Sequence, residues 1–327
     1  MKETMHSPQE LYKLFEEYRT KHSFSFSPNE LYEPIRYILD LGGKRMRPLL
    51  TLMGCDLFKG KIEDALPVAY AVELFHNFTL VHDDIMDNAH LRRNHPTVHE
   101  EFGTARAILS GDVMMIYVYE FLNHLETKKF RKAIDLFNTT AIRVCEGQQY
   151  DLNFQPAKEV SVKDYLMMIE FKTAVLLACS LKLGAIVADA DETNGNDLFE
   201  FGKNMGICFQ LLDDMLDAFG EESKVGKKIG GDIAQNKKTY LSIKALELAK
   251  SDEKEKLIYY FSNNVPVDEK VKHVLEIYHK LGMEKCARAE AEKFHHAAFD
   301  SLDNVKVDEE RKKVLKEFAA SLLKRQS

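Results

Sequence analysis

Apolar residues recur at a spacing of three and four positions along most of the chain. Residues with this spacing share one face of an α-helix, whereas a half-buried strand would need strict alternation of apolar and polar positions. We find no competing set of alternating segments. The clearest helical groups are Leu11, Leu14, Phe15 and Tyr18, then Leu74, Phe78 and Val81, and finally Val314, Leu315, Phe318 and Leu322. The pattern predicts an all-α protein.

Two of the expected helices are apolar on most of their faces. Residues 70–81 read YAVELFHNFTLV, and residues 173–188 read TAVLLACSLKLGAIVA. Helices of this kind are enclosed by other helices. The chain has 327 residues, 45% of them hydrophobic, and no Ser/Gly-rich or Pro-rich linker divides it. We therefore expect residues 1–327 to form a single domain, one large helical bundle.

The composition argues against several classes of partner. With 45 basic and 52 acidic residues the formal net charge is −7, so no general attraction to nucleic acid is expected. No run of about 20 uncharged apolar residues could span a membrane, and the first residues are charged where a signal peptide would be apolar. The five cysteines are dispersed and never form a CxxC pair, which argues against a disulfide framework. We expect a cytoplasmic protein.

Three aspartates lie within five positions in the stretch VHDDIMD, residues 81–87. On a helix Asp83 and Asp87 lie one turn apart on the same face, with Asp84 on the adjoining edge. Like charges at this spacing repel one another, so either solvent screens them or a cation is bound between them. For one such motif alone, a solvated acidic helix end is an equally good interpretation.

A second DDxxD motif changes that balance. The stretch FQLLDDMLD, residues 209–217, places Asp213, Asp214 and Asp217 at the same spacing, again after an apolar run. Mg²⁺ prefers oxygen ligands and is usually held by one or two carboxylates together with substrate phosphates. Six carboxylates without a His or Cys partner in the motif favour a metal-bridged polyphosphate over a structural zinc ion.

Basic residues occur in compact groups, although the chain is acidic overall. Arginine holds phosphate oxygens in a bidentate fork, whereas lysine acts as a mobile point charge. Two anionic head groups could therefore be bound, although each basic group taken alone could also be solvated surface. The groups are Lys44, Arg45 and Arg47; Arg92 and Arg93; Lys227 and Lys228; and Lys237 and Lys238.

Six separated motifs resemble, in order, the signature set of the trans-isoprenyl diphosphate synthases, also called polyprenyl synthetases. They are LGGKRMRP, ELFHNFTLVHDDIMDNAHLRRNHPTVH, AILSGD, FKTA, FQLLDDMLD and GKKIGGDIAQNKKTY, which together span about residues 41–240. The resemblance implies an all-α isoprenoid synthase fold with a central active-site cavity, usually as a homodimer. It also implies a transferase that joins an allylic diphosphate to isopentenyl diphosphate with the help of two or three Mg²⁺ ions.

The resemblance assigns a role to each matching residue. The metal ligands would be Asp83, Asp84, Asp87, Asp213, Asp214 and Asp217. Isopentenyl diphosphate would be bound by Lys44, Arg47, His76 and Arg93. The allylic diphosphate would be bound by Arg92, Lys172, Thr173, Gln210, Lys227 and Lys237. Asn94 departs from the family pattern, because a glycine is common after the arginine pair.

Product length depends on residues shortly before the first DDxxD motif. Phe78 lies five positions before Asp83 and could form the floor of a tunnel for the growing chain. An aromatic residue here, beside Thr79, resembles geranylgeranyl-type synthases. We therefore expect a C20 product, geranylgeranyl diphosphate, with farnesyl diphosphate (C15) or a longer polyprenyl diphosphate as the alternatives.

Other functions fit fewer of these features. His82 and Asp83 form an HD pair, as in metal-dependent phosphohydrolases, but that function would leave the second DDxxD motif and LGGKRMRP without a role. A terpene cyclase would not need the group for isopentenyl diphosphate. A non-catalytic partner subunit of a prenyl synthase generally lacks intact aspartate motifs, and both are intact here. His76 taken alone could be an ordinary core histidine.

Overall fold

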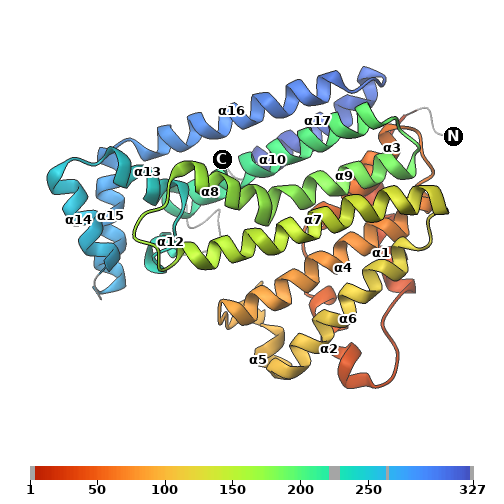
Figure 1. The fold of residues 1–327 in the computed structure, drawn as a ribbon, viewed down its shortest axis with the longest axis horizontal. Coiled ribbons are helices and arrows are strands. Elements are labelled where there is room, and N and C mark those ends of the chain that lie inside the picture. Colours follow the sequence, from red (N-terminus) through yellow and green to blue (C-terminus); the bar gives the residue numbers. More distant parts are fainter. Residues whose placement is uncertain (1–3, 221–228, 263–264, 325–327) are drawn as a thin grey trace. The chain divides into compact units, whose positions relative to one another are not determined.

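The computed structural model describes residues 4–220, 229–262 and 265–324, and helices dominate it (Figure 1). The prediction of an all-α protein is confirmed. Within those ranges the one sheet is a hairpin of two short strands, β1 (Leu91–Arg92) and β2 (His95–Pro96), in the connector after the first DDxxD motif. In the same part of the chain no helix is long and apolar enough to cross a membrane.

The chain divides into two compact units, which we describe separately; the single domain stays a prediction. The first unit comprises the described residues of Met1–Thr139, Cys179–Phe199 and Val305–Leu315. Its helices are α1 (Pro8–Lys21), α2 (Asn29–Asp40), α3 (Met46–Leu57), α4 (Ile62–Met86), α5 (Val98–Phe102) and α6 (Thr104–Leu122).

The second unit comprises the described residues of Thr140–Ala178, Glu200–Asn304 and Lys316–Ser327. Its helices are α8 (Val162–Ile169), the π-helix η1 (Glu170–Ala174), α12 (Gly231–Ala234), α13 (Tyr240–Leu248), α14 (Ser251–Ser262), α15 (Val267–Lys280) and α16 (Met283–Asn304). Four boundaries between the units fall within α7 (Thr127–Phe154), α9 (Val175–Val187), α10 (Glu192–Phe219) and α17 (Glu309–Lys324), and the fifth falls at the end of α16.

Helix α4 is the central element of the first unit, as its apolar sequence predicts. It packs against α1, α2, α3, α5 and α6. Tyr70 and Phe75 are fully buried on it. Because the first half of α4 is buried in the core, the position of its acidic last turn is fixed.

Helix α1 begins with a capping box. The Glu10 amide donates to the Ser7 hydroxyl (3.2 Å), and the Ser7 amide donates to the Glu10 carboxylate (2.8 Å). Pro8 occupies the first helical position, where its missing amide proton costs no helical hydrogen bond. Leu11 and Phe15 then bury the inner face, which leaves Glu16 and Arg19 at its edge.

Helices α3 and α9 approach each other within the first unit through two glycines. A Cβ atom at Gly184 would lie 2.1 Å from the Thr51 carbonyl oxygen, and one at Gly54 would lie 2.3 Å from the Leu181 carbonyl oxygen. Real Cβ atoms do not come so close to backbone, so only glycine permits this separation of the two helices.

We predict that Gly184→Ala lowers the free energy of unfolding by about 1–3 kcal/mol, because the added methyl group pushes α9 away from α3. The matched control is Gly195→Ala on α10, where the new Cβ would meet only the Lys182 side chain at 3.8 Å. There the better helix propensity of alanine should add about 0.5–1 kcal/mol. Urea denaturation of both variants measures the difference, and equal stabilities would contradict the packing argument.

Candidate functional site

The first DDxxD motif forms the last turn of α4. Asp84 is buried, Asp83 is half-buried, and Asp87 is exposed as the C-cap, its amide donating to the Asp83 carbonyl at 2.8 Å. The C-terminal end of a helix carries a partial negative charge and favours cations. Three carboxylates at this end are therefore unfavourable unless positive charge compensates them.

Arg92 compensates Asp84 directly. Its Nε and Nη2 donate to the two carboxylate oxygens at 2.7 and 2.6 Å, a bidentate fork between the hairpin and the helix. The arginine is brought back by the tight turn at Arg93 and Asn94, whose φ values are 53° and 65°. A two-residue hairpin turn with both φ values positive suits asparagine as well as glycine, so the departure at Asn94 is compatible with this turn.

Arg93 lies against the loop that precedes α3. Its Nη1 donates to the Gly42 carbonyl oxygen. A Cβ atom at Gly43, whose φ is +133°, would lie 2.7 Å from Arg93 Nη2. The glycine pair of LGGKRMRP thus leaves room for the guanidinium group, while Lys44 in the same loop is exposed.

His76 and Arg47 form a pair beside this loop. Arg47 Nη1 lies 3.1 Å from His76 Nε2. Since arginine can only donate, Nε2 accepts and the ring proton is on Nδ1. Burial, and then the charges of Arg47, Arg93, Arg92 and Arg45, hold the pKa of His76 well below its usual value. Burial also lowers the pKa of Arg47 to about 10, so it stays charged at neutral pH beside a neutral histidine.

The structure thus brings together three of the four residues predicted for isopentenyl diphosphate, namely Arg47, His76 and Arg93. The charges of four arginines lower the pKa of His76, and such a concentration of positive charge favours the binding of an anion. The alternative of an ordinary core histidine does not account for the half-buried position of His76 next to Arg47.

Phe78 points into an aromatic group on the first unit. Its ring centroid lies 5.8 Å from Phe75 and 4.6 Å from His82, and Phe75 in turn lies 5.1 Å from Phe137. The Thr79 hydroxyl donates to the His76 carbonyl (2.8 Å), one turn back on the helix.

His82 is packed toward α6 and is not aligned with the acids. Its Nε2 lies 3.3 Å from the Ile108 carbonyl oxygen, and a Cβ atom at Gly111 would lie 2.4 Å from the same nitrogen. This placement disfavours the HD-type phosphohydrolase, in which the histidine would share a metal ion with the aspartate.

The second DDxxD motif lies in the last turns of α10 and, like the first, buries only its middle aspartate. Asp213 is exposed, Asp214 is buried, and Asp217 is half-buried. Asp214 accepts from the Tyr165 hydroxyl and from Gln210 Nε2 (3.1 Å). Burial raises the pKa of Asp214 to about 7, although the bond from Tyr165 opposes the shift.

The FKTA motif forms the π-helix η1, and glycines on two neighbouring helices make room for it. A Cβ atom at Gly147 of α7 would lie 2.3 Å from the Lys172 amide nitrogen, and one at Gly206 of α10 would lie 2.6 Å from the Ala174 Cα. Single π-helical turns are frequent at functional sites. Here Lys172 Nζ pairs with Asp151, and the Thr173 hydroxyl lies 3.5 Å from Gln210 Oε1.

Asp232 is a site residue that the sequence reasoning missed. Its amide donates to Asp217 Oδ2 at 2.9 Å, and its carboxylate lies 3.1 Å from Lys237 Nζ. After burial, its charge is the largest cause that raises the pKa of Asp217. The signal was present as the acid in GGDIAQNKK, but a single aspartate between glycine and isoleucine carries no spacing that marks it. Lys227, also predicted here, lies outside the described residues.

The donor chemistry of both motifs fits Mg²⁺. In each motif the aspartates at positions one and five have solvent access near the negative end of a helix, and the ligand atoms are all oxygen. In the part of the chain that the structure describes, no three Asp, Glu, His or Cys side chains converge closely enough to hold a metal ion by themselves. Mg²⁺ sites completed by substrate phosphates need only one or two carboxylates from the protein.

Comparisons with known proteins agree with this geometry. The geranylgeranyl diphosphate synthase of Saccharolobus solfataricus is 38% identical over 313 residues, 94% of each chain. A solved geranylgeranyl pyrophosphate synthase is 41% identical with a TM-score of 0.94, covering 99% of this chain and 100% of its own. The geranylgeranyl pyrophosphate synthase of Corynebacterium glutamicum, solved with calcium and isoprenyl diphosphate, is 26% identical with a TM-score of 0.82, covering 97% and 96%.

Residues 28–278, which hold every site residue discussed above, match the polyprenyl synthetase family. The all-α fold of this chain is accordingly the isoprenoid synthase fold. The protein belongs to the polyprenyl synthetase family.

Proposed function

We propose that the protein is a short-chain trans-prenyltransferase that condenses isopentenyl diphosphate with an allylic diphosphate to make geranylgeranyl diphosphate. The observation that carries the proposal is the charge arrangement of the first unit. Arg47 and Arg93 lie around a neutral His76, while Asp83 and Asp87 lie on the same helix as that histidine. One helix thus carries groups for a diphosphate and groups for a cation. The names of the geranylgeranyl diphosphate synthases at 38–41% identity support the product.

We propose that the six aspartates bind Mg²⁺ together with the allylic diphosphate, and that Arg92, Lys172, Thr173, Gln210, Lys227 and Lys237 bind the same diphosphate. The calcium bound by the solved Corynebacterium relative supports a divalent metal at such a site. When bound, Mg²⁺ would neutralise charge on the diphosphate. To bind the metal, Asp84 would first have to release Arg92, and Asp214 would have to release Tyr165.

The reaction follows from these contacts. The cationic side chains stabilise the negative charge that gathers on the departing diphosphate, so that the allylic C–O bond ionises. Lys44, Arg47, His76 and Arg93 hold isopentenyl diphosphate so that its double bond attacks the allylic cation, and apolar walls exclude water. The released diphosphate then accepts the proton that is lost. A neutral His76 contributes a hydrogen bond here and not a charge.

The experiment that tests the function uses purified protein, Mg²⁺ and isopentenyl diphosphate with dimethylallyl, geranyl or farnesyl diphosphate in turn. Chromatography of the products should show C20 as the main end product. A C15 or C25 end product would keep the reaction and replace the product. No chain extension with any primer, from protein that gives a helical circular dichroism spectrum, would reject the proposal.

Asp83→Ala and Asp213→Ala should each reduce kcat by about a hundredfold or more, since each removes a charge that the ionisation step depends on. Their helical circular dichroism should stay unchanged. Asp135→Ala, an exposed acid on α7, is the matched control and should keep full activity. Full turnover in either motif variant would mean that the two motifs do not both serve the reaction.

Phe78→Ala should yield a product at least one isoprene unit longer, because it removes the phenylalanine ring closest in sequence to the first motif. The gain should stay small, since Phe75 and Phe137 still lie behind it. Tyr12→Ala, an exposed aromatic residue on α1, is the control. An unchanged product distribution would place the length limit elsewhere.

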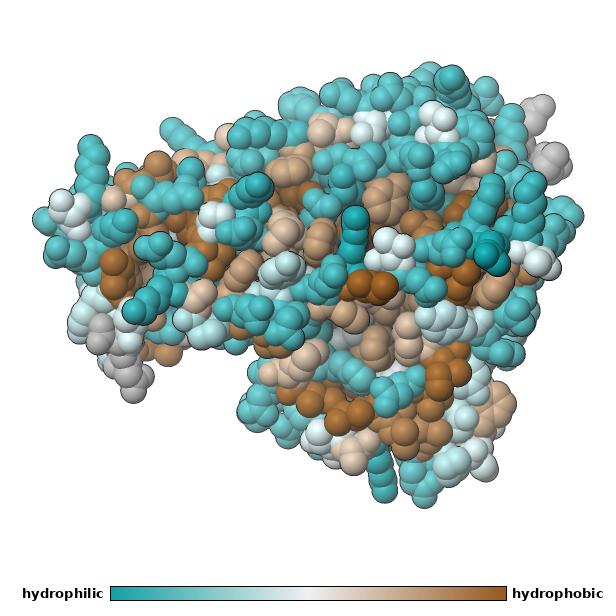
Figure 2. Space-filling view, viewed as in Figure 1, coloured by the Kyte–Doolittle hydropathy of each residue, from teal (hydrophilic) through white to brown (hydrophobic). Residues whose placement is uncertain are grey.

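We also propose that the protein forms a homodimer through α6. This helix exposes Ile108, Leu109, Ile116 and Tyr119, between 37% and 66% of each side chain, along one stripe. Figure 2 shows apolar side chains gathered in the region of the first unit where Figure 1 places α6. An apolar stripe of this kind is typical of an interaction surface, and a second copy would bring a matching stripe.

Ile116→Glu should convert a dimer into a monomer in analytical ultracentrifugation, because it would bury a charge in the interface. Ile258→Glu, at a site of similar exposure on α14, should leave the mass unchanged. A wild-type monomer at micromolar concentration would contradict the proposal. The cytoplasm remains our proposed location, supported by five dispersed cysteines that never form a CxxC pair, and cell fractionation would test it.

A further inference from the structure

Arg45 adopts an unusual backbone conformation in the loop between α2 and α3. Its φ is 47°, in the left-handed region, and Gly42 and Gly43 before it also have positive φ values of 77° and 133°. For a residue with a side chain this conformation costs about 1–2 kcal/mol. It persists only where the surroundings determine it strongly. Contacts outside the loop are therefore needed to stabilise the left-handed conformation of Arg45.

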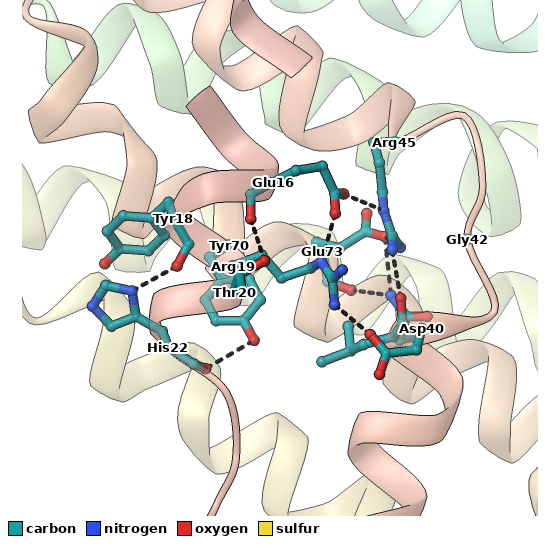
Figure 3. A network of polar contacts seen from close by, with 12 residues as sticks. Glu16, Tyr18, Arg19, Thr20, His22, Asp40, Gly42, Arg45, Tyr70 and Glu73 are labelled. Atoms are coloured by element: carbon teal, nitrogen blue, oxygen red, sulfur yellow. Dashed lines mark hydrogen bonds and ion pairs between the residues drawn. The ribbon is translucent and has the colours of Figure 1, made fainter. Parts of the chain in front are cut away.

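The side chain of Arg45 supplies that support (Figure 3). It turns into the first unit, where only 2% of it is exposed. Its Nη1 donates to Glu73 Oε1 on α4 at 2.7 Å, and its Nε donates to Glu16 Oε1 on α1 at 3.0 Å. Its Nη2 donates to the Leu39 carbonyl oxygen at the end of α2. One guanidinium group therefore joins three helices to the first residue before α3.

Glu16 is connected by hydrogen bonds to both ends of the loop between α2 and α3. Its second carboxylate oxygen accepts from Arg19 Nε at 2.9 Å, and Arg19 Nη1 donates to Asp40, the last residue of α2, at 2.7 Å. The start of the loop is thus held through Arg19 and its end through Arg45. Glu16 remains partly accessible, with 24% of its side chain exposed, whereas Glu73 is buried with Arg45.

The loop positions the residues that were predicted to bind isopentenyl diphosphate. Lys44 precedes Arg45, and Arg47, which contacts His76, follows it by two residues. The Gly42 carbonyl oxygen accepts from Arg93. A shift of the loop would move all of these groups relative to one another. Arg45 itself is turned away from them, so it cannot exchange its buried partners for a ligand without removing the guanidinium group that pairs with the buried Glu73 carboxylate.

We propose that Arg45, held by Glu16 and Glu73, is a positioning residue that sets the course of residues 42–47 and through it the affinity for isopentenyl diphosphate. This inference rests on the proposed function. It assigns a role to α1, which lies outside the aspartate and arginine motifs. It also gives the three basic residues of LGGKRMRP two different roles. Arg45 holds the loop in place through buried hydrogen bonds, and Lys44 and Arg47 bind the ligand.

The test uses Glu16→Gln and Arg45→Lys in the full-length protein. Steady-state rates are measured with isopentenyl diphosphate varied at saturating allylic diphosphate, and then the reverse. KM for isopentenyl diphosphate should rise about tenfold, the order of one displaced charged hydrogen bond. KM for the allylic diphosphate and kcat should stay within about twofold, since neither substitution alters a group that holds that substrate.

Thr20→Ala is the matched control, because its hydroxyl donates to the Glu16 carbonyl oxygen and not to the carboxylate. It should leave both KM values unchanged. Glu16→Gln keeps the test decisive if Arg45→Lys fails to fold. A lower melting temperature with unchanged KM for isopentenyl diphosphate, or an equal rise in both KM values, would overturn the positioning role.

The wild-type rates distinguish the two proposals. If the wild-type protein condenses the substrates and the variants show no selective change in KM, the positioning role fails alone. If the wild-type protein extends no primer and shows no heat of binding with isopentenyl diphosphate in calorimetry, the proposed function fails and the positioning role fails with it.

Discussion

Repulsion among like charges is the constraint on which the first unit depends. Four arginines influence His76, and a cluster of this kind is unstable unless acids lie close to it. Glu73 and Asp84, both buried on α4, supply those acids to Arg45 and Arg92. Arg47 and Arg93 are left with positive charge that no such fork neutralises, and Glu73 is the only acid among the causes that shift their pKa values. The helix that carries the aspartate motif therefore also balances the arginines.

In both DDxxD motifs the middle aspartate differs from the outer two in its surroundings. In each, the middle aspartate is buried and engaged by a protein donor, Arg92 in one and Tyr165 in the other. Of the outer aspartates, Asp87 and Asp213 are exposed, and Asp83 and Asp217 are half-buried, all at the negative end of a helix. A carboxylate with both oxygens engaged fixes the orientation of its helix turn, which sets the direction of its neighbours one and three positions away. The spacing thus fixes the directions of the outer aspartates relative to the buried one.

The sequence predicted the helical fold correctly and proposed a set of candidate site residues, because both depend on local patterns. Three-and-four spacing identified the helices, and two acid clusters with nearby arginines indicated a diphosphate and a metal. The sequence could not tell Asp83 from Asp84, which differ by one position, because burial depends on Arg92 eight residues later. It grouped Arg45 with Lys44 and Arg47 for the same reason, since its partners lie 28 and 29 residues away. The π-helical form of FKTA depends on Gly147 and Gly206, which no local pattern connects to it.

Placing carboxylates at the C-terminal ends of α4 and α10 has a consequence for substrate binding. Each carboxylate there is disfavoured by the helix dipole, by about 0.3–1 kcal/mol at an exposed position. A divalent cation removes that penalty, and the cation in turn favours an anionic diphosphate. The arginine cluster around His76 lacks negative charge, so it favours an anion. Both groups of charges are therefore unbalanced in the free protein: the acidic helix ends favour a cation, and the arginine cluster favours an anion. The basic side of this balance does not gain a charge from His76 near neutral pH, because burial and the neighbouring arginines hold the pKa of His76 well below its usual value.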